Sequence, residues 1–346
     1  METNQQTVLR RPAEWEPHKA TILAWPHNRE TWPDQMLERV EEVFVRFLYT
    51  IARSEAVWVI TGDQKSFTKA EKVVKEMAAP NEIRILPCPI NDMWVRDSGP
   101  VCVMSGDEPQ FLNFHFNAWG EKYQPWEDDD HLPWVLAGKM GYPVHDVPVT
   151  LEGGAIECNG AGTLITTESV LLNPNRRNGT KSQIEQQLRQ WLGCDTVIWL
   201  AAGLAGDDTD GHIDDLVRFV DHNTVVAMRS EGKSDINHEV LKENYRRLRQ
   251  AHTSDGHALE IIDLPQPKTY TDRPTVDGSN HLPASYANFY ITNTSLILPL
   301  YDERFDDQVI SIFRDVFSAR QIKGIPARDL VWGQGSFHCI SQEVYQ

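Results

Sequence analysis

The 346-residue chain has no apolar run near the ~18 residues that are needed to cross a bilayer. Its N-terminal stretch, METNQQTVLRRPAEWEP, also lacks the apolar segment of a secretory signal peptide. Basic residues are few, with 33 Lys and Arg against 50 Asp and Glu, which gives a net charge of -17. Nucleic acids and anionic membranes both need a cationic surface, so neither is expected as a partner. We therefore predict a cytoplasmic protein.

Cofactor motifs are missing as well. The sequence has no G-x-G-x-x-G segment after a predicted strand and no Walker A motif. The five cysteines form no C-x-x-C pair, and none has zinc-finger spacing from a pair of histidines. We therefore predict no cofactor and no metal, and we expect the cysteines to be reduced.

What the sequence does have is a repeated alternation of helical and strand-like segments. Apolar periodicity predicts helices over residues 34–53, 64–79, 131–141, 182–193, 237–252 and 306–318. A short apolar strand candidate follows each helix, and the starts of the last five helices lie 51 to 69 residues apart. This rhythm predicts an α/β fold in one domain spanning residues 1–346. We expect five similar units in a ring, with their post-strand loops converging on the centre.

The loops after these strands contain the residue types of a catalytic site. NDMWVRDSGP contains Asp97, LEGG contains Glu152, GDDTDGHIDD contains His212 and Asp214, and GQGSFHCISQE contains Cys339. A free thiol in a polar, glycine-flexible loop is a candidate nucleophile, and His212 is available as its acid/base. The pair indicates a cysteine hydrolase.

Each candidate also has a structural interpretation. Asp97 could close an Asx-turn, and the acidic run around His212 has the composition of a solvated turn or of a divalent-cation site. Because that run leads directly into LVRFV, a predicted strand, we expect His212 and Asp214 to alternate onto one face of it. A Mg²⁺ or Ca²⁺ site needs no cysteine and the sequence has no second His cluster, so the catalytic interpretation is favoured. The two glycines after Glu152 allow the backbone there to approach a ligand or another segment closely.

Several carboxylates beside a Cys–His pair indicate a cationic substrate. Acids next to a scissile peptide carbonyl would oppose the negative charge that develops there. A guanidinium, in contrast, is planar, cationic and suited to bidentate contacts with carboxylates. We therefore predict a small cationic guanidine as the partner of this protein. The oligomeric state stays open, and a homo-oligomer is compatible with the sequence.

The same loops resemble the agmatine deiminase family, which includes bacterial peptidylarginine-deiminase-like proteins and belongs to the guanidine-modifying pentein superfamily. The resemblance is carried by PAEWEPHKATILAWP, NDMWVRDSGP, LEGGAIECNGAGTLITTE, LLNPNRRN, DDTDGHIDD, SYANFYITN and GQGSFHCISQE, and it covers essentially the whole chain. It implies a five-bladed, pseudo-fivefold α/β propeller of ββαβ-type units. It also implies hydrolysis of agmatine to N-carbamoylputrescine and ammonia through a covalent amidino-cysteine, a reaction of putrescine biosynthesis.

The resemblance also assigns roles to individual residues. Cys339 matches the family's nucleophile, and His212 matches its acid/base. Asp97 and Asp214 match the carboxylates that bind the guanidinium, and Glu152 resembles the acid that supports the histidine in related proteins.

Two further residues and one departure bear on the substrate. Trp94 lies beside Asp97 and is expected to stack on the cation, and Asp208 is a candidate partner for the distal ammonium of agmatine. Where the family usually has GGGN before its Ile-His-Cys segment, this chain has GQGS before Phe-His-Cys. Deimination of arginine or of peptidyl-arginine, and non-catalytic guanidine binding, therefore stay as alternatives.

Overall fold

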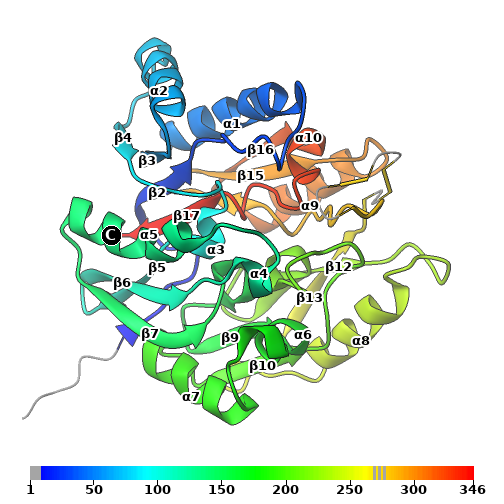
Figure 1. Cartoon of the computed structure of the whole chain (residues 1–346). Helices are drawn as coiled ribbons and strands as arrows, with labels where there is room; N and C mark the ends of the chain where they lie inside the picture. Colours follow the sequence, from blue (N-terminus) through cyan, green and yellow to red (C-terminus); the bar gives the residue numbers. More distant parts are fainter. Residues whose placement is uncertain (1–8, 268–269, 272–273, 276–277) are drawn as a thin grey trace, which may run out of the picture.

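The structure is a computed structural model that describes residues 9–267, 270–271, 274–275 and 278–346 (Figure 1). Residues 1–8, where no leader segment is predicted, lie outside the described part. The strands of the described part form five separate sheets, which gives a mixed α/β fold.

The bounds of the strands follow sheet by sheet. The first sheet contains β1 (Leu9–Arg10), β5 (Val101–Ser105), β6 (Glu108–His115) and β7 (Val144–Thr150). The second contains β8 (Glu157–Cys158), β9 (Thr163–Thr167) and β10 (Thr196–Leu200), and the third contains β11 (Val217–Phe219), β12 (Thr224–Arg229) and β13 (Glu260–Pro265). The fourth contains β14 (Tyr290–Ile291), β15 (Ser295–Leu300) and β16 (Gln321–Pro326). The fifth contains β17 (Ser341–Tyr345), β2 (His18–Ala24), β3 (Ala56–Thr61) and β4 (Ile83–Pro87).

Every sheet repeats one arrangement, in which an antiparallel strand pair is followed, after a helix, by a parallel strand. The antiparallel pairs are β5/β6, β8/β9, β11/β12, β14/β15 and β17/β2, and the parallel strands that follow are β7, β10, β13, β16 and β3. In the fifth sheet the C-terminal strand β17 pairs with β2, the second strand of the chain. This sheet is therefore closed by strands that are far apart in the sequence, and the predicted alternation of helices and strands is confirmed.

Six helices lie in the connections to parallel strands. They are α1 (Met36–Ala52), α2 (Gln64–Glu76), α5 (Glu127–Met140), α7 (Lys181–Leu192), α8 (His238–Leu248) and α9 (Asp306–Val316). All six match the predicted helices within a few residues, and most of them have a clear apolar face in their own sequence. In α1, for example, Val40, Phe44, Phe47 and Ile51 are buried on one face. Helix α2 is capped by Asp63, whose side chain accepts a hydrogen bond from the Ser66 backbone N–H.

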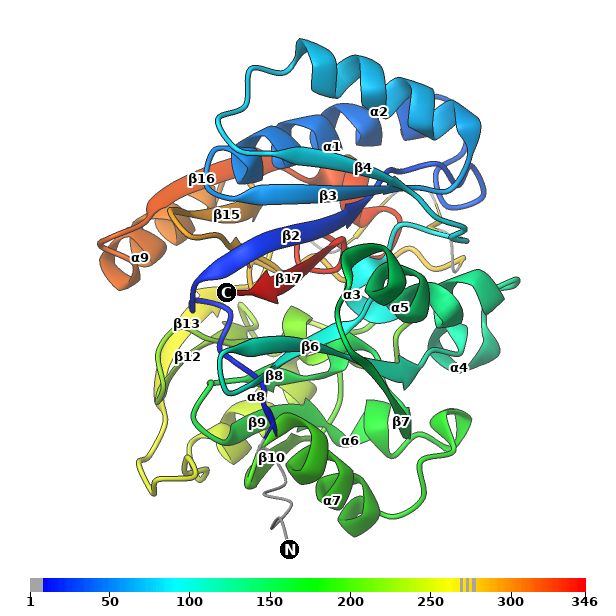
Figure 2. The same ribbon diagram turned by 90° about the vertical axis from the view of Figure 1, so that its left-hand side faces the viewer.

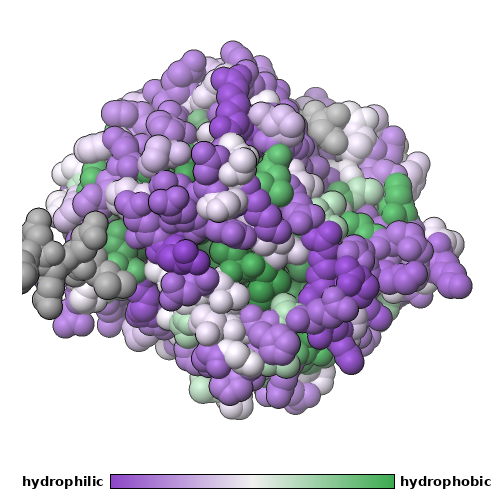
Figure 3. Space-filling view, turned by 90° about the horizontal axis from the view of Figure 1, so that it is seen from below, coloured by the Kyte–Doolittle hydropathy of each residue, from purple (hydrophilic) through white to green (hydrophobic). Residues whose placement is uncertain are grey.

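The helices lie on the outside of the molecule and the strands lie inside it (Figures 1 and 2). Helices α1 and α2 cover one end, and α7 covers the opposite end. The face shown in Figure 3 is mostly hydrophilic, with apolar residues only in small areas. Within the described residues, no helix combines the length and the hydrophobicity that a membrane span requires.

Short helical turns lie in the loops between these elements. They are α3 (Val95–Ser98), α4 (Ala118–Glu121), η1 (Gly153–Ala155), α6 (Glu168–Leu171), η2 (Pro174–Arg176), η3 (Ile213–Asp215) and α10 (Arg328–Val331). The prediction that His212 and Asp214 alternate along a strand is wrong. His212 is the N-cap of η3 and Asp214 lies within it, and β11 begins only at Val217. A 3-10 turn, rather than strand alternation, therefore sets the directions of these two side chains.

Candidate active site

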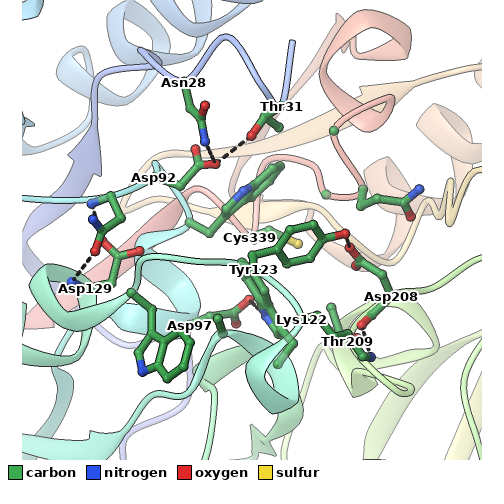
Figure 4. A pocket seen from close by; sticks show the side chains of 18 of the residues that line it. Asn28, Thr31, Asp92, Asp97, Lys122, Tyr123, Asp129, Asp208, Thr209 and Cys339 are labelled. Carbon is green, nitrogen blue, oxygen red and sulfur yellow. Dashed lines mark hydrogen bonds between the residues drawn. The ribbon is translucent and has the colours of Figure 1, made fainter. Parts of the chain in front are cut away.

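One cavity of about 670 Å³ is lined by residues from loops that are far apart in the sequence (Figure 4). Of the predicted site residues, Trp94, Asp97, Asp208, His212 and Cys339 line it. The remaining two, Glu152 and Asp214, do not line the cavity and are fully buried beside it. The structure thus gathers all seven residues into one region, as expected for converging loops.

Gly154 is the point at which three of these groups meet. Its backbone N–H donates to Asp97 Oδ1 at 3.0 Å. A Cβ atom on Gly154 would lie 2.6 Å from His212 Nδ1, 2.9 Å from Asp97 Oδ1 and 3.1 Å from Asp214 Oδ2. At Gly153 a Cβ would lie 2.1 Å from the Arg96 carbonyl oxygen. The close backbone approach that the sequence predicts at these glycines is therefore confirmed, and only glycine fits.

His212 lies between two carboxylates. Its Nδ1 is 3.7 Å from Asp97 Oδ1 and its Nε2 is 3.8 Å from Glu152 Oε2. Glu152 is held in turn by Arg176, whose Nε donates to Oε1 at 2.7 Å. Burial by itself lowers the pKa of His212, but Asp97, Glu152 and Asp214 outweigh it and raise that pKa to about 10. The imidazole is therefore protonated at neutral pH.

Asp97 has a neutral donor on each oxygen. Besides the Gly154 N–H on Oδ1, the indole Nε1–H of Trp119 donates to Oδ2 at 3.0 Å. Burial raises the pKa of Asp97 to about 6, with Asp214 and Glu152 adding to the effect, while His212 and Trp119 oppose it. The carboxyl group is therefore ionised at neutral pH, but the surrounding protein groups do not fully balance its negative charge.

Cys339 lies in the turn directly before β17 and is 6% exposed. Its Sγ is 3.1 Å from Asn288 Nδ2 and 3.7 Å from Asp214 Oδ2. Burial raises the pKa of this thiol well above its usual value, and Asp214, Asp215 and Asp97 raise it further. Without a bound cation the thiol form is favoured, because burial and the nearby acids both disfavour the thiolate.

Asp214 and Asp215 face different surroundings. Asp214 Oδ2 lies 2.7 Å from His338 Nδ1, and His338 Nε2 lies 2.9 Å from Glu14 Oε2. Asp215, not Asp214, lines the cavity, and its Oδ1 accepts a hydrogen bond from Asn288 Nδ2 at 3.0 Å. Asp215, Asn288 and Glu14 were not predicted as site residues from the sequence. Asn288 lies in SYANFYITN and Glu14 lies in PAEWEPHKATILAWP. Both segments carry the family resemblance, and that resemblance was the only signal in the sequence that these residues belong to the site.

Trp94 and Asp208 stand on the cavity wall in fixed positions. The Trp94 ring packs on Trp32 with centroids 5.6 Å apart, and a Cβ on Gly335 would lie 2.4 Å from its Cζ3. Asp208 Oδ2 accepts a hydrogen bond from the Tyr123 hydroxyl at 2.6 Å (Figure 4). Both side chains are thus held by the protein at the surface that a ligand would contact.

The segment over the cavity around Trp119 has an unusual backbone. Ala118, Trp119, Gly120 and Glu121 have φ values of 50°, 55°, 93° and 65°, and Ala118 and Trp119 line the cavity together with Lys122 and Tyr123. A left-handed conformation costs a non-glycine residue roughly 1–2 kcal/mol. Strain of this kind persists only where the surroundings enforce it, and it clusters at functional sites. Nothing in the local sequence pattern predicted this turn.

The described residues contain no group of three or more His, Cys, Asp or Glu side chains arranged to hold a metal ion. The acids in and beside the cavity instead pair with His212, Arg176 and His338, or accept hydrogen bonds from neutral donors. Their arrangement suits an organic cation that brings its own N–H donors.

Fold and site together define an α/β enzyme whose cavity combines a cysteine, a histidine and several carboxylates. Residues 10–344 match the family model of the Porphyromonas-type peptidyl-arginine deiminases. The chain therefore belongs to this family of deiminases, which are hydrolases of C–N bonds, and the resemblance inferred from the sequence is confirmed.

Individual relatives agree with this assignment. A Vibrio parahaemolyticus protein named "Putative agmatine deiminase" is 35% identical over 351 residues, which cover 96% of each chain. The structure of the agmatine deiminase of Enterococcus faecalis superposes with a TM-score of 0.91 and 29% identity, covering 100% of this chain and 98% of that one. A variant of the C. jejuni agmatine deiminase with substrate bound gives a TM-score of 0.89 and 29% identity, covering 100% and 99%.

Proposed function

We propose that this protein hydrolyses agmatine to N-carbamoylputrescine and ammonia through a covalent amidino-cysteine. Support comes from relatives that are named agmatine deiminases and from a cavity in which Cys339, His212 and Asp97 meet. We also propose that the five sheets act as the blades of a pseudo-fivefold propeller, whose central loops build this cavity.

The observation that carries the choice of substrate is the charge of the cavity wall. The residues that line it include six acids, Glu30, Asp92, Asp97, Asp129, Asp208 and Asp215, but only two Arg or Lys residues, Arg29 and Lys122. Arg29 pairs with Glu38, and Lys122 Nζ lies 2.8 Å from Asp210 Oδ1. Among the described lining residues, no Arg or Lys is thus left without an acidic partner to receive an α-carboxylate. Agmatine carries no carboxylate and a second positive charge, so it fits this wall better than arginine does.

In the first half of the reaction, Asp97 binds the guanidinium from the cavity wall and Asp214 binds it from beside Sγ. The bound cation lowers the pKa of the Cys339 thiol, which loses its proton to solvent. The thiolate forms a C–S bond with the central carbon, and the C–N bond to an amino group breaks. His212 gives its proton to the departing ammonia, and an S-alkylthiouronium remains on Cys339.

In the second half, neutral His212 takes a proton from water, and the resulting hydroxide attacks the same carbon. The C–S bond breaks, the leaving thiolate takes up the proton of the new hydroxyl group, and the neutral ureido product is released as the Cys339 thiol is restored. Glu152 keeps His212 oriented and stabilises its protonated form, and Arg176 fixes Glu152. Over one cycle, agmatine and water give N-carbamoylputrescine and ammonia.

The test is ammonia and ureido-product release from agmatine, arginine and an arginyl peptide, with Cys339→Ala as the matched inactive variant. We expect turnover of agmatine that is lost in Cys339→Ala by at least ~10⁴-fold, since the nucleophile acts in every step. Turnover of arginine or the peptide in preference to agmatine would instead favour the alternative deiminases. Absence of turnover with all three substrates would favour a non-catalytic guanidine-binding protein.

A further inference from the structure

We propose that Trp119 is a positioning residue for Asp97, presented to it by the left-handed turn of residues 118–121. The inference rests on the proposed function in one respect, namely that Asp97 binds the cationic group of the substrate. Trp119 is assigned no part in bond making or bond breaking.

The geometry of the contact carries the first step. Asp97 Oδ2 accepts from Trp119 Nε1 at 3.0 Å, and Oδ1 accepts from the Gly154 N–H at 3.0 Å. One donor on each oxygen fixes the plane of the carboxylate, because both bonds must be kept at once. The remaining lone pairs of Asp97 are available to the cavity, which both Asp97 and Trp119 line. Donors from two loops thus orient the Asp97 carboxylate toward the cavity.

The backbone around Trp119 supports a role beyond packing. Trp119 itself has a φ of 55°, and the neighbouring non-glycine residues Ala118 and Glu121 have φ values of 50° and 65°. A right-handed turn is the conformation that L-residues prefer, and it would place the indole elsewhere. Position 120 accepts only glycine, because a Cβ there would lie 2.2 Å from Asn175 Nδ2. Three of these four residues thus have unfavourable conformations, in the turn whose indole donates to Asp97.

The turn is anchored on both sides. At its start, Asn117 Oδ1 accepts from the Gly120 N–H at 2.9 Å, and Asn117 Nδ2 donates to the Asn175 carbonyl at 2.9 Å. At its end, Glu121 pairs with Arg177 at 2.7 Å. The Trp119 ring itself stands edge-on to Phe116 and Tyr123, with centroids 5.2 Å and 5.7 Å away. These contacts hold the turn in place and pack the indole whose Nε1 donates to Asp97.

The substitution Trp119→Phe tests the inference, because it keeps an aromatic ring at this place and removes the N–H donor, and the matched control loses the same part of an indole. The matched control is Trp134→Phe, which removes a similar bond from Trp134 Nε1 to Asp146 Oδ1 (2.8 Å) on a side chain that is 41% exposed and outside the cavity lining. We expect kcat/KM for agmatine at pH 7 to fall by about tenfold to a hundredfold in Trp119→Phe only. The acidic limb of its pH profile should move up by about one pH unit, since the Trp119 bond favours the charged form of Asp97. Trp119→Tyr, which restores a donor at the ring edge, should reverse part of both changes.

A second measurement does not depend on turnover. Cys339 is alkylated with chloroacetamidine, which carries an amidinium, and with the neutral chloroacetamide, and the ratio of the two rates is compared. The wild type should prefer the amidinium reagent, and Trp119→Phe should lose most of that preference at pH 7 while Trp134→Phe keeps it. An unchanged ratio together with an unmoved pH profile would overturn the role of Trp119. A wild type that prefers chloroacetamidine but does not hydrolyse agmatine would refute the proposed substrate. The alkylation ratios of Trp119→Phe and Trp134→Phe would then still decide whether Trp119 positions Asp97.

Discussion

His338 Nδ1 lies 2.7 Å from Asp214 Oδ2, so the residue that precedes the candidate nucleophile also holds the carboxylate beside it. The same oxygen of Asp214 is 3.7 Å from Cys339 Sγ. His338 and Cys339 are neighbours in one turn, so this turn sets both the position of the sulfur and its distance from the negative charge of Asp214.

The first prediction concerns the charge of Asp214. Its carboxylate raises the pKa of the Cys339 thiol, so Asp214→Asn should lower that pKa in the free protein. We expect neutral iodoacetamide to alkylate Cys339 faster at pH 7 in this variant, while agmatine turnover falls at least ~100-fold because a guanidinium contact is lost. Rates of alkylation by mass spectrometry check the first effect. Asp107→Asn, at an exposed position between β5 and β6, should change neither rate.

The pH dependence of the reaction follows from two groups. Asp97 must be charged to bind the cation, and its pKa of about 6 sets the acidic limb. His212 must be protonated to release ammonia, and its pKa of about 10 sets the basic limb. We expect kcat/KM for agmatine to rise through about pH 6, to level off, and to fall through about pH 10. A profile whose limbs do not move in Asp97→Asn or His212→Gln would contradict these assignments.

Much of the fold was predictable because its signals are local. The predicted helix over residues 34–53 is α1 (Met36–Ala52), since its apolar face is written in the periodicity of its own residues. The gathering of Cys339, His212 and Asp97 was predictable too, because loops after equivalent strands reach the same place. The direction of a side chain in a loop was not predictable in this way. His212 and Asp214 lie at a 3-10 turn instead of a strand, and only tertiary contacts hold Trp119 in a left-handed conformation.

Gly335 is expected to be essential for the shape of the site. A Cβ there would lie 2.4 Å from Trp94 Cζ3 and 3.0 Å from Cys339 Cβ, and neither neighbour is free to move. Gly335→Ala should therefore displace one of them, lower kcat for agmatine by at least about tenfold and destabilise the fold by ~1–3 kcal/mol. Gly138→Ala is the matched control, because Gly138 lies in the last turn of α5 and nothing lies within 4 Å of a Cβ there. It should keep full activity and raise the melting temperature slightly, since alanine favours a helix by ~1 kcal/mol over glycine.

The last prediction separates recognition of the distal ammonium from the chemistry. Asp208 lines the cavity and its Oδ2 accepts a hydrogen bond from the Tyr123 hydroxyl at 2.6 Å, which keeps its carboxylate in place for a second positive charge. In Asp208→Asn we expect KM for agmatine to rise about tenfold with kcat nearly unchanged, the effect of one charged hydrogen bond of ~1.4 kcal/mol. Butylguanidine, which has the same guanidinium but no distal ammonium, is the control substrate, and its KM should not change.

The comparison of the two substrates decides the role of Asp208. Equal losses for both would mean that the substitution disturbs the guanidinium end through the neighbouring His212 loop rather than the distal contact. An unchanged KM for agmatine would remove Asp208 from substrate binding altogether. A loss that is confined to agmatine would locate the distal ammonium at this carboxylate. It would also explain a preference for agmatine over arginine, because agmatine carries two positive charges and both basic residues of the wall, Arg29 and Lys122, already have acidic partners.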